Sequence, residues 1–590
     1  MIKHFFTSML AALAAIWISI PLLGVLLLIF VGAIVSIGNI EQPTTKVADN
    51  SILYIDLATT LTERQSNPDM EAIIYGITED ETLLQPTLNA IKRAATDDKI
   101  KGIYIDAGPL SGGIASVYTL ACAINEFKRE SGKWVVAYGD EISQGSYLVV
   151  SGATDLFLNP EGMVDIHGLS SDITFYKGLL DKVGVEVQVV KVGTFKSAVE
   201  PYILTEISDA NRMQTEAILN AVWGNLATLI ADNRNTSLAE VNAWADSMLL
   251  THAPVSLAER HIVDSLLYRH QAEDILRDRI GIDKNKELPL ISPDDYDTTT
   301  PLSIAKRGKE IAVLYAEGEI AESGSTGITS DKLVPQILSL SKDDNIVGMV
   351  MRVNSPGGSA FASEQIWEAL EQFKAKGKVL YVSMGDYAAS GGYYISCGAD
   401  RIFASPVTLT GSIGIFGLIP NLQGLLTDKL GITQSTVSTN KSGVFPNITK
   451  PLTPFELASM QNMVNRGYET FVSRCADGRE METDSIKAIA EGRVWDGATA
   501  LSIGLVDELG TLDEAIEALA SEAGLSSYKV VEYPESKPNI WSILISASRN
   551  LDASVRRSII GDDAYDMYSE INRITSMRGV QAIAPQLDIK

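Results

Sequence analysis

The chain has 590 residues, of which 46% are hydrophobic and 21% are charged, so it is long enough for several folded domains and is neither disordered nor fibrous. Its formal net charge of -26 disfavours association with phosphate backbones or anionic lipid surfaces, and we expect no nucleic acid as a partner. The three cysteines lie far apart and show no C-x-x-C spacing, which excludes a readable disulfide framework or zinc knuckle.

Residues 1–45 are predicted to form a membrane anchor. No charged residue appears from Phe5 to Ile40, whereas a helix needs only about 20 apolar residues to span a bilayer core. This run is much longer than the apolar region of a cleavable signal peptide, which favours an uncleaved signal anchor. A lysine precedes the run and Glu41 follows it, so the positive-inside rule puts the start in the cytoplasm and the body outside.

The rest of the chain contains an internal repeat. The stretch "KGIYIDAGPLSGGIAS" at 101–116 resembles "VGMVMRVNSPGGSAFA" at 347–362, and the longer stretch 134–160 parallels 379–406. In the second pair, matching glycine and proline residues are separated by a constant 246 positions. A constant offset over such a length indicates a duplicated unit.

Each copy is predicted to have an α/β fold with parallel strands and crossover helices. Apolar, β-rich runs such as "GMVMRV" and "KVLYVSM" alternate with helical patterns such as "SEQIWEALEQFKAKG". Long helices are expected over 209–234 and 453–479, in the second half of each copy. The predicted boundaries follow from these patterns: a first copy at 46–290, a linker at 291–308, a second copy at 309–540, and a tail at 541–590 that matches nothing in the first copy.

One hydroxyl stands out in the second copy. Ser390 precedes two glycines in "GDYAASGGYYISCGAD", where an apolar strand turns into a helical pattern. By itself this pattern is typical of a helix N-cap. The corresponding residue of the first copy is Gln144, whose amide cannot form an acyl intermediate, so a nucleophile is available in the second copy alone.

A serine nucleophile needs a base, and no histidine follows His270. A lysine can serve if burial lowers the pKa of its amine. Two lysines occupy corresponding places in the two copies: Lys196 in "KVGTFKSAVEPY" and Lys441 in "VSTNKSGVFPN". Acyl transfer also needs backbone N–H groups for the oxyanion, and Gly357, Gly358 and Gly391 are the candidates.

The motifs "GTFKSAVEP", "NSPGGS", "GDYAASGGYY", "TGSIGI" and "GRVWDGATALSIGLVDELG" resemble the long, tandem-repeat form of the signal peptide peptidase A family, the protease IV type. The resemblance covers nearly the whole chain and implies a fold like those of ClpP and the crotonases in both copies. It implies that Ser390 is the nucleophile, that Lys196 is the general base, and that Ser412 orients the lysine. Short family members take both residues from one repeat about fifty positions apart, a spacing that Lys441 also fits, so Lys441 stays as the alternative base.

The resemblance further implies a membrane-anchored serine protease with its catalytic body on the outer, periplasmic side of the bacterial plasma membrane. Its substrates would be cleaved signal peptides and other short or unfolded peptides. A homotetramer is implied, and no metal or cofactor is expected. Two alternatives remain: a crotonase-like enzyme acting on acyl-CoA, and a catalytically inactive membrane scaffold.

Overall fold

The computed structural model describes residues 47–64, 81–299, 308–534 and 581–584. The predicted anchor at Phe5 to Ile40 lies outside these residues. Among the helices of the described part, none is both long and apolar enough to cross a bilayer.

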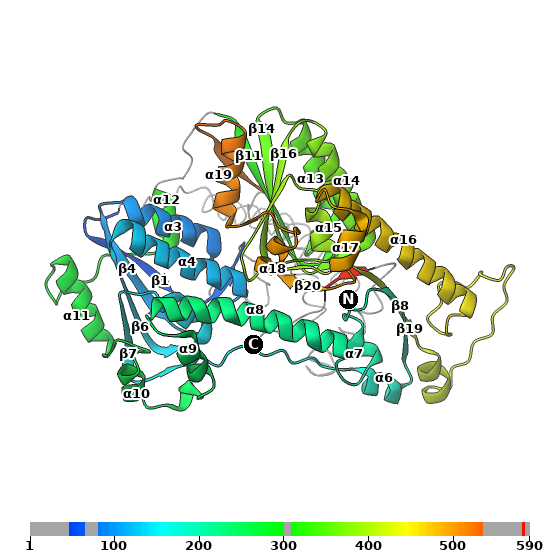
Figure 1. The fold of residues 1–590 in the computed structure, drawn as a ribbon, viewed down its shortest axis with the longest axis horizontal. Helices are drawn as coiled ribbons and strands as arrows, with labels where there is room; N and C mark the ends of the chain where they lie inside the picture. The colour runs from blue at the N-terminus through cyan, green and yellow to red at the C-terminus, as the bar shows by residue number, and fades with distance from the viewer. Residues whose placement is uncertain (1–46, 65–80, 300–307, 535–580, 585–590) are drawn as a thin grey trace, which may run out of the picture.

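The first half of the chain forms a six-stranded, wholly parallel sheet in the order β10-β1-β4-β6-β7-β9 (Figure 1). A small parallel sheet, β3-β2-β5, lies beside it. The strands of this half are β1 (Ser51–Asp56), β2 (Thr60–Thr62), β3 (Glu81–Leu83), β4 (Ile100–Ala107), β5 (Ser111–Gly112), β6 (Trp134–Ile142), β7 (Asp155–Val164), β8 (Glu186–Val192), β9 (Ser265–Leu266) and β10 (Leu290–Ile291). Its helices are α3 (Leu84–Thr96), α4 (Ile114–Ser131), α5 (Gln144–Val150), α6 (Lys177–Val183), α7 (Glu200–Ile203), α8 (Asp209–Asn233), α9 (Leu238–Ala245), η1 (Leu249–Thr251), α10 (Pro254–Glu259), α11 (Arg269–Ile280) and α12 (Pro293–Thr299).

The second half builds a similar sheet, in the order β20-β18-β16-β14-β11-β22, with β17 attached to β16 and β21 attached to β17. Its strands are β11 (Glu310–Glu317), β12 (Ile320–Ala321), β13 (Ile328–Thr329), β14 (Ile346–Ser355), β15 (Gly357–Ser359), β16 (Val379–Ala389), β17 (Arg401–Ala404), β18 (Leu409–Gly411), β19 (Ile415–Asn421), β20 (Val494–Asp496), β21 (Glu508–Leu509), β22 (Lys529–Tyr533) and β23 (Gln581–Ile583). Its helices are α13 (Ser330–Lys342), α14 (Ala360–Lys374), α15 (Gly391–Ser396), η2 (Leu425–Lys429), α16 (Pro454–Gly478), α17 (Thr483–Ile489), α18 (Gly497–Ser502) and α19 (Leu512–Glu522). The prediction of α/β units with parallel strands is therefore confirmed.

The central strands are buried along nearly their whole length, because helices cover both faces of each of the two large sheets. Strand β14, for example, has eight buried residues among its ten. In the sequence, such strands are continuous apolar runs in which polar and apolar residues do not alternate. The long helices α8 and α16 begin within one residue of the predicted starts, at the side-chain caps Ser208 and Thr453.

The segment predicted as a linker begins inside the first half. Strand β10 pairs with β1, and α12 packs against α3. Tyr296 is buried at 2% exposure and its hydroxyl donates to Asp97 Oδ2 over 2.9 Å. The proline and acidic residues of this stretch start a short helix, and its apolar residues Ile291 and Tyr296 complete the first core.

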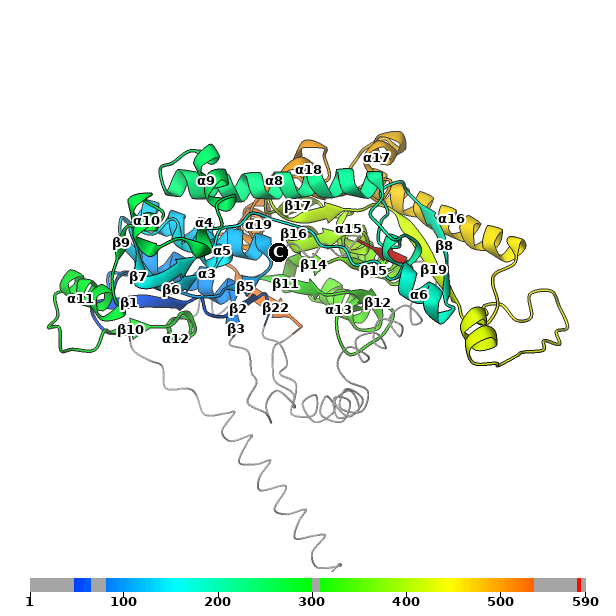
Figure 2. The same ribbon diagram turned by 90° about the horizontal axis from the view of Figure 1, so that it is seen from below.

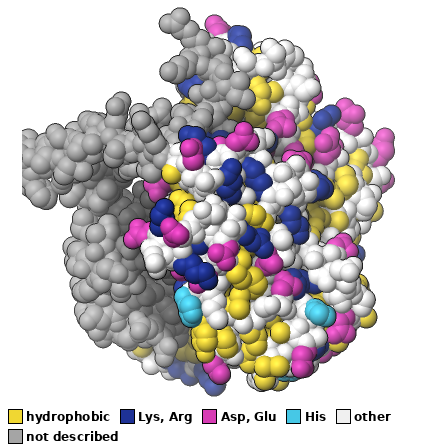
Figure 3. Space-filling model, turned by 90° about the vertical axis from the view of Figure 1, so that its left-hand side faces the viewer, with side chains coloured by type: hydrophobic (Ala, Val, Ile, Leu, Met, Phe, Trp, Pro, Cys, Tyr) yellow, Lys and Arg dark blue, Asp and Glu magenta, His cyan; other side chains and the backbone are white. Residues whose placement is uncertain are grey.

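A third sheet joins the two halves, and it matters most for function. Its order is β13-β12-β15-β23-β19-β8, and β8 from the first half pairs with β19 from the second along seven residue pairs. The two strands run side by side in both ribbon views (Figures 1 and 2). Helix α8 runs from the first sheet to the second and contacts β20 (Figure 2). The outer end of the first half carries interspersed acidic and basic side chains (Figure 3).

Candidate active site

Ser390 lies in the sharp turn between β16 and α15. Its backbone has φ 56° and ψ −114°, a conformation that costs a non-glycine residue about 1–3 kcal/mol. Two backbone hydrogen bonds hold it: Ser390 N donates to Gly411 O over 2.7 Å, and Tyr394 N donates to Ser390 O over 2.8 Å. Although Ser390 occupies the N-cap position, its side chain makes no capping hydrogen bond. The hydroxyl contacts a lysine instead.

The two glycines after Ser390 are required by close packing. A Cβ atom on Gly391 would lie 2.7 Å from Ser363 Oγ, and one on Gly392 would lie 2.6 Å from Ser355 O. Neither position can hold a larger residue without moving its neighbours. The Ser-Gly-Gly pattern therefore packs the start of α15 against the end of β14 and against α14.

Lys196 comes from the first half of the chain and reaches Ser390 across the joint sheet. It lies in the loop between β8 and α7, directly after the strand that pairs with β19. Phe195 N donates to Glu491 O over 3.0 Å, which ties this loop to the second half. The Lys196 Nζ atom lies 2.7 Å from Ser390 Oγ. One member of this pair thus belongs to each copy of the repeat.

The amine of Lys196 has a donor and acceptor arrangement that suits its neutral form. Besides Ser390 Oγ, Nζ lies 3.2 Å from Ser412 O and 3.1 Å from Ser412 Oγ. A neutral amine has two N–H donors and one lone pair. If both N–H groups bond to the two oxygens of Ser412, the lone pair faces the hydroxyl of Ser390. This is the orientation in which the amine accepts a proton from the serine.

Burial favours that neutral form. Lys196, Ser390 and Ser412 have no exposed surface. Desolvation lowers the pKa of Lys196 well below its ordinary value, because a charged ammonium group loses its hydration in the protein interior. No carboxylate contributes to this shift, so nothing offsets the effect of burial.

Ser412 is fixed by its backbone. Its φ is 53°, its N–H donates to Arg493 O over 2.7 Å, and its hydroxyl lies 3.4 Å from Gly492 O. Both oxygens that contact the amine are therefore held by the segment that leads into β20.

The three predicted oxyanion glycines cluster around Ser390. A Cβ on Gly357 would lie 2.6 Å from Gly391 N, and one on Gly391 would lie 3.1 Å from Gly358 N. Gly357 has φ 102°, which only glycine adopts readily. Its own N–H, however, donates to Ser355 Oγ over 3.1 Å. The N–H groups of Gly358 and Gly391 therefore remain as the candidate donors, and a side chain at Gly357 would collide with Gly391 N.

The alternative lysine lies elsewhere. Lys441 is exposed in the segment between η2 and α16. Among the described residues, the amine within hydrogen-bonding distance of Ser390 Oγ is that of Lys196.

Two glycines that hold the lysine stem were not identified from the sequence. A Cβ on Gly492 would lie 2.7 Å from Lys196 Cβ, and one on Gly414 would lie 3.3 Å from Lys196 Cδ. Both occur in motifs already noted: Gly492 is the first residue of "GRVWDGATALSIGLVDELG", and Gly414 lies in "TGSIGI". Their role becomes visible only when the two halves are brought together.

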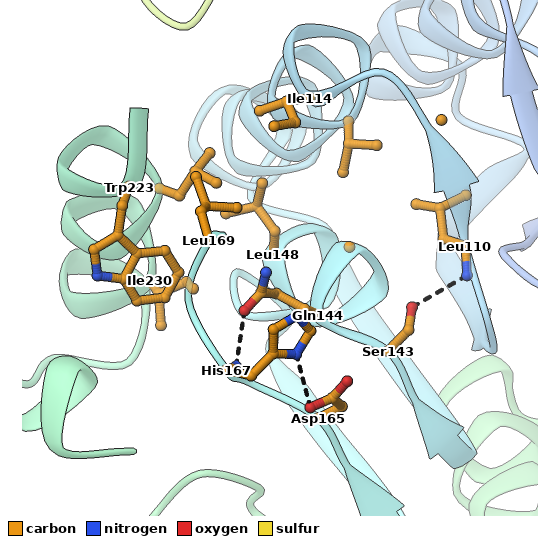
Figure 4. A pocket seen from close by; sticks show the side chains of 14 residues that line it. Leu110, Ile114, Ser143, Gln144, Leu148, Asp165, His167, Leu169, Trp223 and Ile230 are labelled. Carbon is orange, nitrogen blue, oxygen red and sulfur yellow. Dashed lines mark hydrogen bonds and ion pairs between the residues drawn. The ribbon is translucent and has the colours of Figure 1, made fainter. Parts of the chain in front are cut away.

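At the corresponding position of the first half, the side-chain amide of Gln144 is bonded to the neighbouring backbone. Gln144 Oε1 accepts hydrogen bonds from His167 N and Gly168 N, each over 2.9 Å, and its Nε2 donates to Gly168 O over 2.9 Å. Beside it lies a cavity of about 260 Å³ with mostly apolar walls, and His167 and Asp165 pair at its edge (Figure 4). This half therefore keeps a cleft but no nucleophile at the position of Ser390.

The sequence matches Peptidase family S49 twice, over residues 127–282 and 372–526, and Clp protease over residues 309–408. It is 35% identical to Protease 4 of Salmonella typhi, over 88% of this chain and 86% of that protein. It is 34% identical to Protease 4 of Haemophilus influenzae, over 78% and 77%. It is 29% identical to the chloroplastic serine protease SPPA of Arabidopsis thaliana, over 85% and 74%.

The fold and these matches define a serine protease. The chain belongs to peptidase family S49, whose domain it contains twice. The predicted tandem repeat, family and enzyme class are thereby confirmed. Each of the two matched segments contains one member of the contact described above, Lys196 in the first and Ser390 in the second.

A stability measurement tests the buried amine independently of catalysis. In the unfolded chain Lys196 titrates near 10.4, whereas its pKa in the folded chain is lower. Between these two values the unfolded state binds one more proton, so the stability of the wild type rises with pH by up to about 1.4 kcal/mol per unit. A methionine lacks this dependence. We expect the stability of Lys196→Met relative to wild type to decline steadily as pH rises from neutral towards 10.

Urea denaturation at a series of pH values measures this difference. Lys441→Met is the matched control, because Lys441 is exposed and its substitution should leave the pH dependence unchanged. Parallel curves for Lys196→Met and wild type would show that the buried lysine stays protonated on folding.

Proposed function

We propose that this protein is an endopeptidase in which Ser390 is the nucleophile and Lys196 is the general base. The single observation that supports this most strongly is the 2.7 Å distance between Lys196 Nζ and Ser390 Oγ in a fully buried setting. A surface lysine would be protonated and unable to accept a proton. Burial gives this lysine the protonation state that the reaction requires.

The reaction would proceed in two steps. The Lys196 amine takes the proton of Ser390 as Oγ attacks the peptide carbonyl, and the N–H groups of Gly358 and Gly391 stabilise the oxyanion. The resulting ammonium group then protonates the leaving amine. Water, activated by the same amine, hydrolyses the acyl-enzyme. The two oxygens of Ser412 accept hydrogen bonds from the Lys196 amine throughout. These bonds keep the lone pair of the Lys196 nitrogen directed at Ser390.

For substrates, we propose cleaved signal peptides and other short or unfolded peptides at the outer face of the bacterial plasma membrane. The uncharged run from Phe5 to Ile40 would anchor the chain there. Apolar peptide segments left in or near the bilayer would then meet the active site at a high local concentration.

We also propose that the chains associate, as the homotetramer implied by the family resemblance. The segment between η2 and α16 extends away from the body (Figure 2). It carries exposed apolar side chains, including Leu430, Ile432 and the fully exposed Val437, and Phe455 at the start of α16 is 70% exposed. A group of exposed apolar side chains on a soluble surface commonly marks a protein–protein contact, and this supports an interface at this extension.

Covalent labelling tests the proposed function. A serine-directed phosphonate should modify the wild type at Ser390, as located by peptide mass spectrometry. Lys196→Ala should react far more slowly, and Lys441→Ala should react at the rate of the wild type. An unlabelled wild type would support the scaffold hypothesis. Acyl-CoA hydrolysis without peptide hydrolysis would support the crotonase-like alternative.

A further inference from the structure

The small sheet of the first half has the same arrangement as part of the joint sheet. The order β3-β2-β5 recurs as β13-β12-β15, and the strands of each set are parallel. Gly112 of β5 and Gly358 of β15 each pair with the middle strand of their set. These two glycines are separated by the repeat offset of 246, and their φ angles are 156° and 158°. The backbone of β5 therefore has the geometry of the strand that packs against α15.

The outer edges of these two strands differ. On its far side β15 pairs antiparallel with β23, and all three residues of β15 are buried. Both residues of β5 are exposed, and in the described part of the chain no strand pairs with its far side. The pairing of β15 shows that an extended segment fits a strand edge of this geometry. The edge of β5 can therefore take up an extended segment from another molecule.

A largely apolar cavity adjoins this edge. Its volume is about 260 Å³, and Gly112 of β5 forms part of its wall. Helices α4, α5 and α8 and the loop after β7 supply most of the remaining wall (Figure 4), chiefly through Ile114, Leu148, Leu169, Trp223 and Ile230. A cavity of roughly 150 Å³ with such walls holds a benzene molecule. This cavity is therefore large enough for one branched or aromatic side chain.

The polar end of the cavity has no group placed to cut a peptide. Gln144 stands where Ser390 stands in the second half, and its amide is hydrogen-bonded to the backbone at 167 and 168. The neighbouring hydroxyl of Ser143 donates to Gly108 O over 3.3 Å. An amide cannot form an acyl intermediate. A peptide that binds at this position therefore stays intact.

We propose that the edge of β5 and the adjoining cavity form a second peptide-binding site, which holds an extended segment of an unfolded substrate without cutting it. The bound segment adds a strand to β3-β2-β5 and places one apolar side chain in the cavity. Main-chain pairing at a sheet edge combined with a side-chain pocket is a general mode of peptide recognition. This inference rests on the proposed function, because another segment of the same substrate reaches Ser390.

A second site changes KM in a way that depends on the length of the substrate. An unfolded protein that occupies both sites has a raised effective concentration at the active site, whereas a peptide that fills only the active site does not. Burial of one apolar side chain changes affinity by about tenfold or more. A blocked cavity should therefore raise KM for the unfolded protein about tenfold and leave kcat unchanged.

Steady-state kinetics with an unfolded protein and with a peptide just long enough for the active-site cleft tests this dependence. Leu169→Trp fills the cavity and should raise KM for the protein about tenfold, with both constants for the short peptide unchanged. Leu169→Ser removes an apolar wall and should act in the same direction. Leu238→Trp is the matched control, because Leu238 is 44% exposed in α9 and does not line the cavity. Unchanged hydrolysis of the short peptide shows that each variant is folded.

Photocrosslinking locates the bound segment without relying on hydrolysis. A short apolar peptide with one benzophenone side chain is irradiated with the full chain, and peptide mass spectrometry maps the adducts. We expect adducts in α5 and α8, around Leu148 and Trp223. Leu169→Trp should abolish these adducts, and Leu238→Trp should retain them.

The outcomes separate this inference from the proposed function. Adducts confined to the residues around Ser390, or equal KM values of Leu169→Trp and wild type for the unfolded protein, would overturn the second site and leave the proposed function standing. A wild type without adducts whose assembly becomes smaller in Leu169→Trp, as measured by sedimentation, would assign the cavity to a neighbouring copy and also overturn it. Adducts in the cavity of a protein that hydrolyses no peptide would support the second site and contradict the proposed function.

Discussion

Ser390→Ala and Lys196→Ala are each expected to lower kcat on an unfolded protein substrate by about three to six orders of magnitude, because the nucleophile and its base act as a unit. For the same reason the double variant should be no less active than either single variant. Lys441→Ala should keep the activity of the wild type, since Lys441 is exposed and the amine beside Ser390 is that of Lys196. Steady-state kinetics with purified proteins measures all four variants.

The contrast between the two lysines is the informative part of this prediction. Full activity in Lys196→Ala together with a loss in Lys441→Ala would reject an active site built from both halves. Circular dichroism of each variant separates loss of function from loss of fold.

Gly492→Ala is expected to lower kcat by about 100-fold while the protein remains folded. Gly492 has φ 76°, and a Cβ there would lie 2.7 Å from Lys196 Cβ and 2.8 Å from its Cα. The added methyl group must displace the lysine backbone, and a displacement of about 1 Å at a catalytic group costs roughly this factor. The variant changes no group that takes part in the chemistry.

Gly377→Ala is the matched control, because it imposes the same backbone strain without the contact. Gly377 has φ 75° in the turn after α14, and a Cβ there meets nothing within 4 Å. Both substitutions should cost about 1 kcal/mol of stability from the left-handed conformation, and only Gly492→Ala should lose activity. Equal activity in the two variants would show that the lysine tolerates displacement or is not the base.

Much of the fold could be predicted from the sequence because its signals are local. Buried parallel strands appear as apolar runs, and α16 starts at Thr453 with a capping box to Glu456 and a proline in its first turn. The repeat offset likewise identified Gln144 as the residue opposite Ser390. The linker prediction differed from the structure at its start, because a Pro- and Asp-rich stretch also contains Ile291 and Tyr296, which complete a core formed much earlier in the chain.

The site could be predicted only in part, because its contacts are long-range. The glycines of "SPGG" indicate close backbone approach, but the hydrogen bond from Gly357 N to Ser355 Oγ depends on the conformation of the turn. Nothing in the local sequence links Gly492 to Lys196, or Ala582 to Gly358, since these pairs meet only through the joint sheet. The choice between Lys196 and Lys441 could be argued from motif context, whereas the distance to Ser390 comes from the pairing of β8 with β19.

The pH dependence of Ser390 phosphonylation tests the central claim most directly, because it reports the protonation of the group that activates the hydroxyl. The rate for the wild type should rise with pH as one proton is lost and then reach a plateau. The midpoint of this rise should lie well below the ordinary lysine pKa of about 10.4. A rate that does not change with pH below that value, or that rises only around it, would contradict a neutral, buried Lys196 as the base.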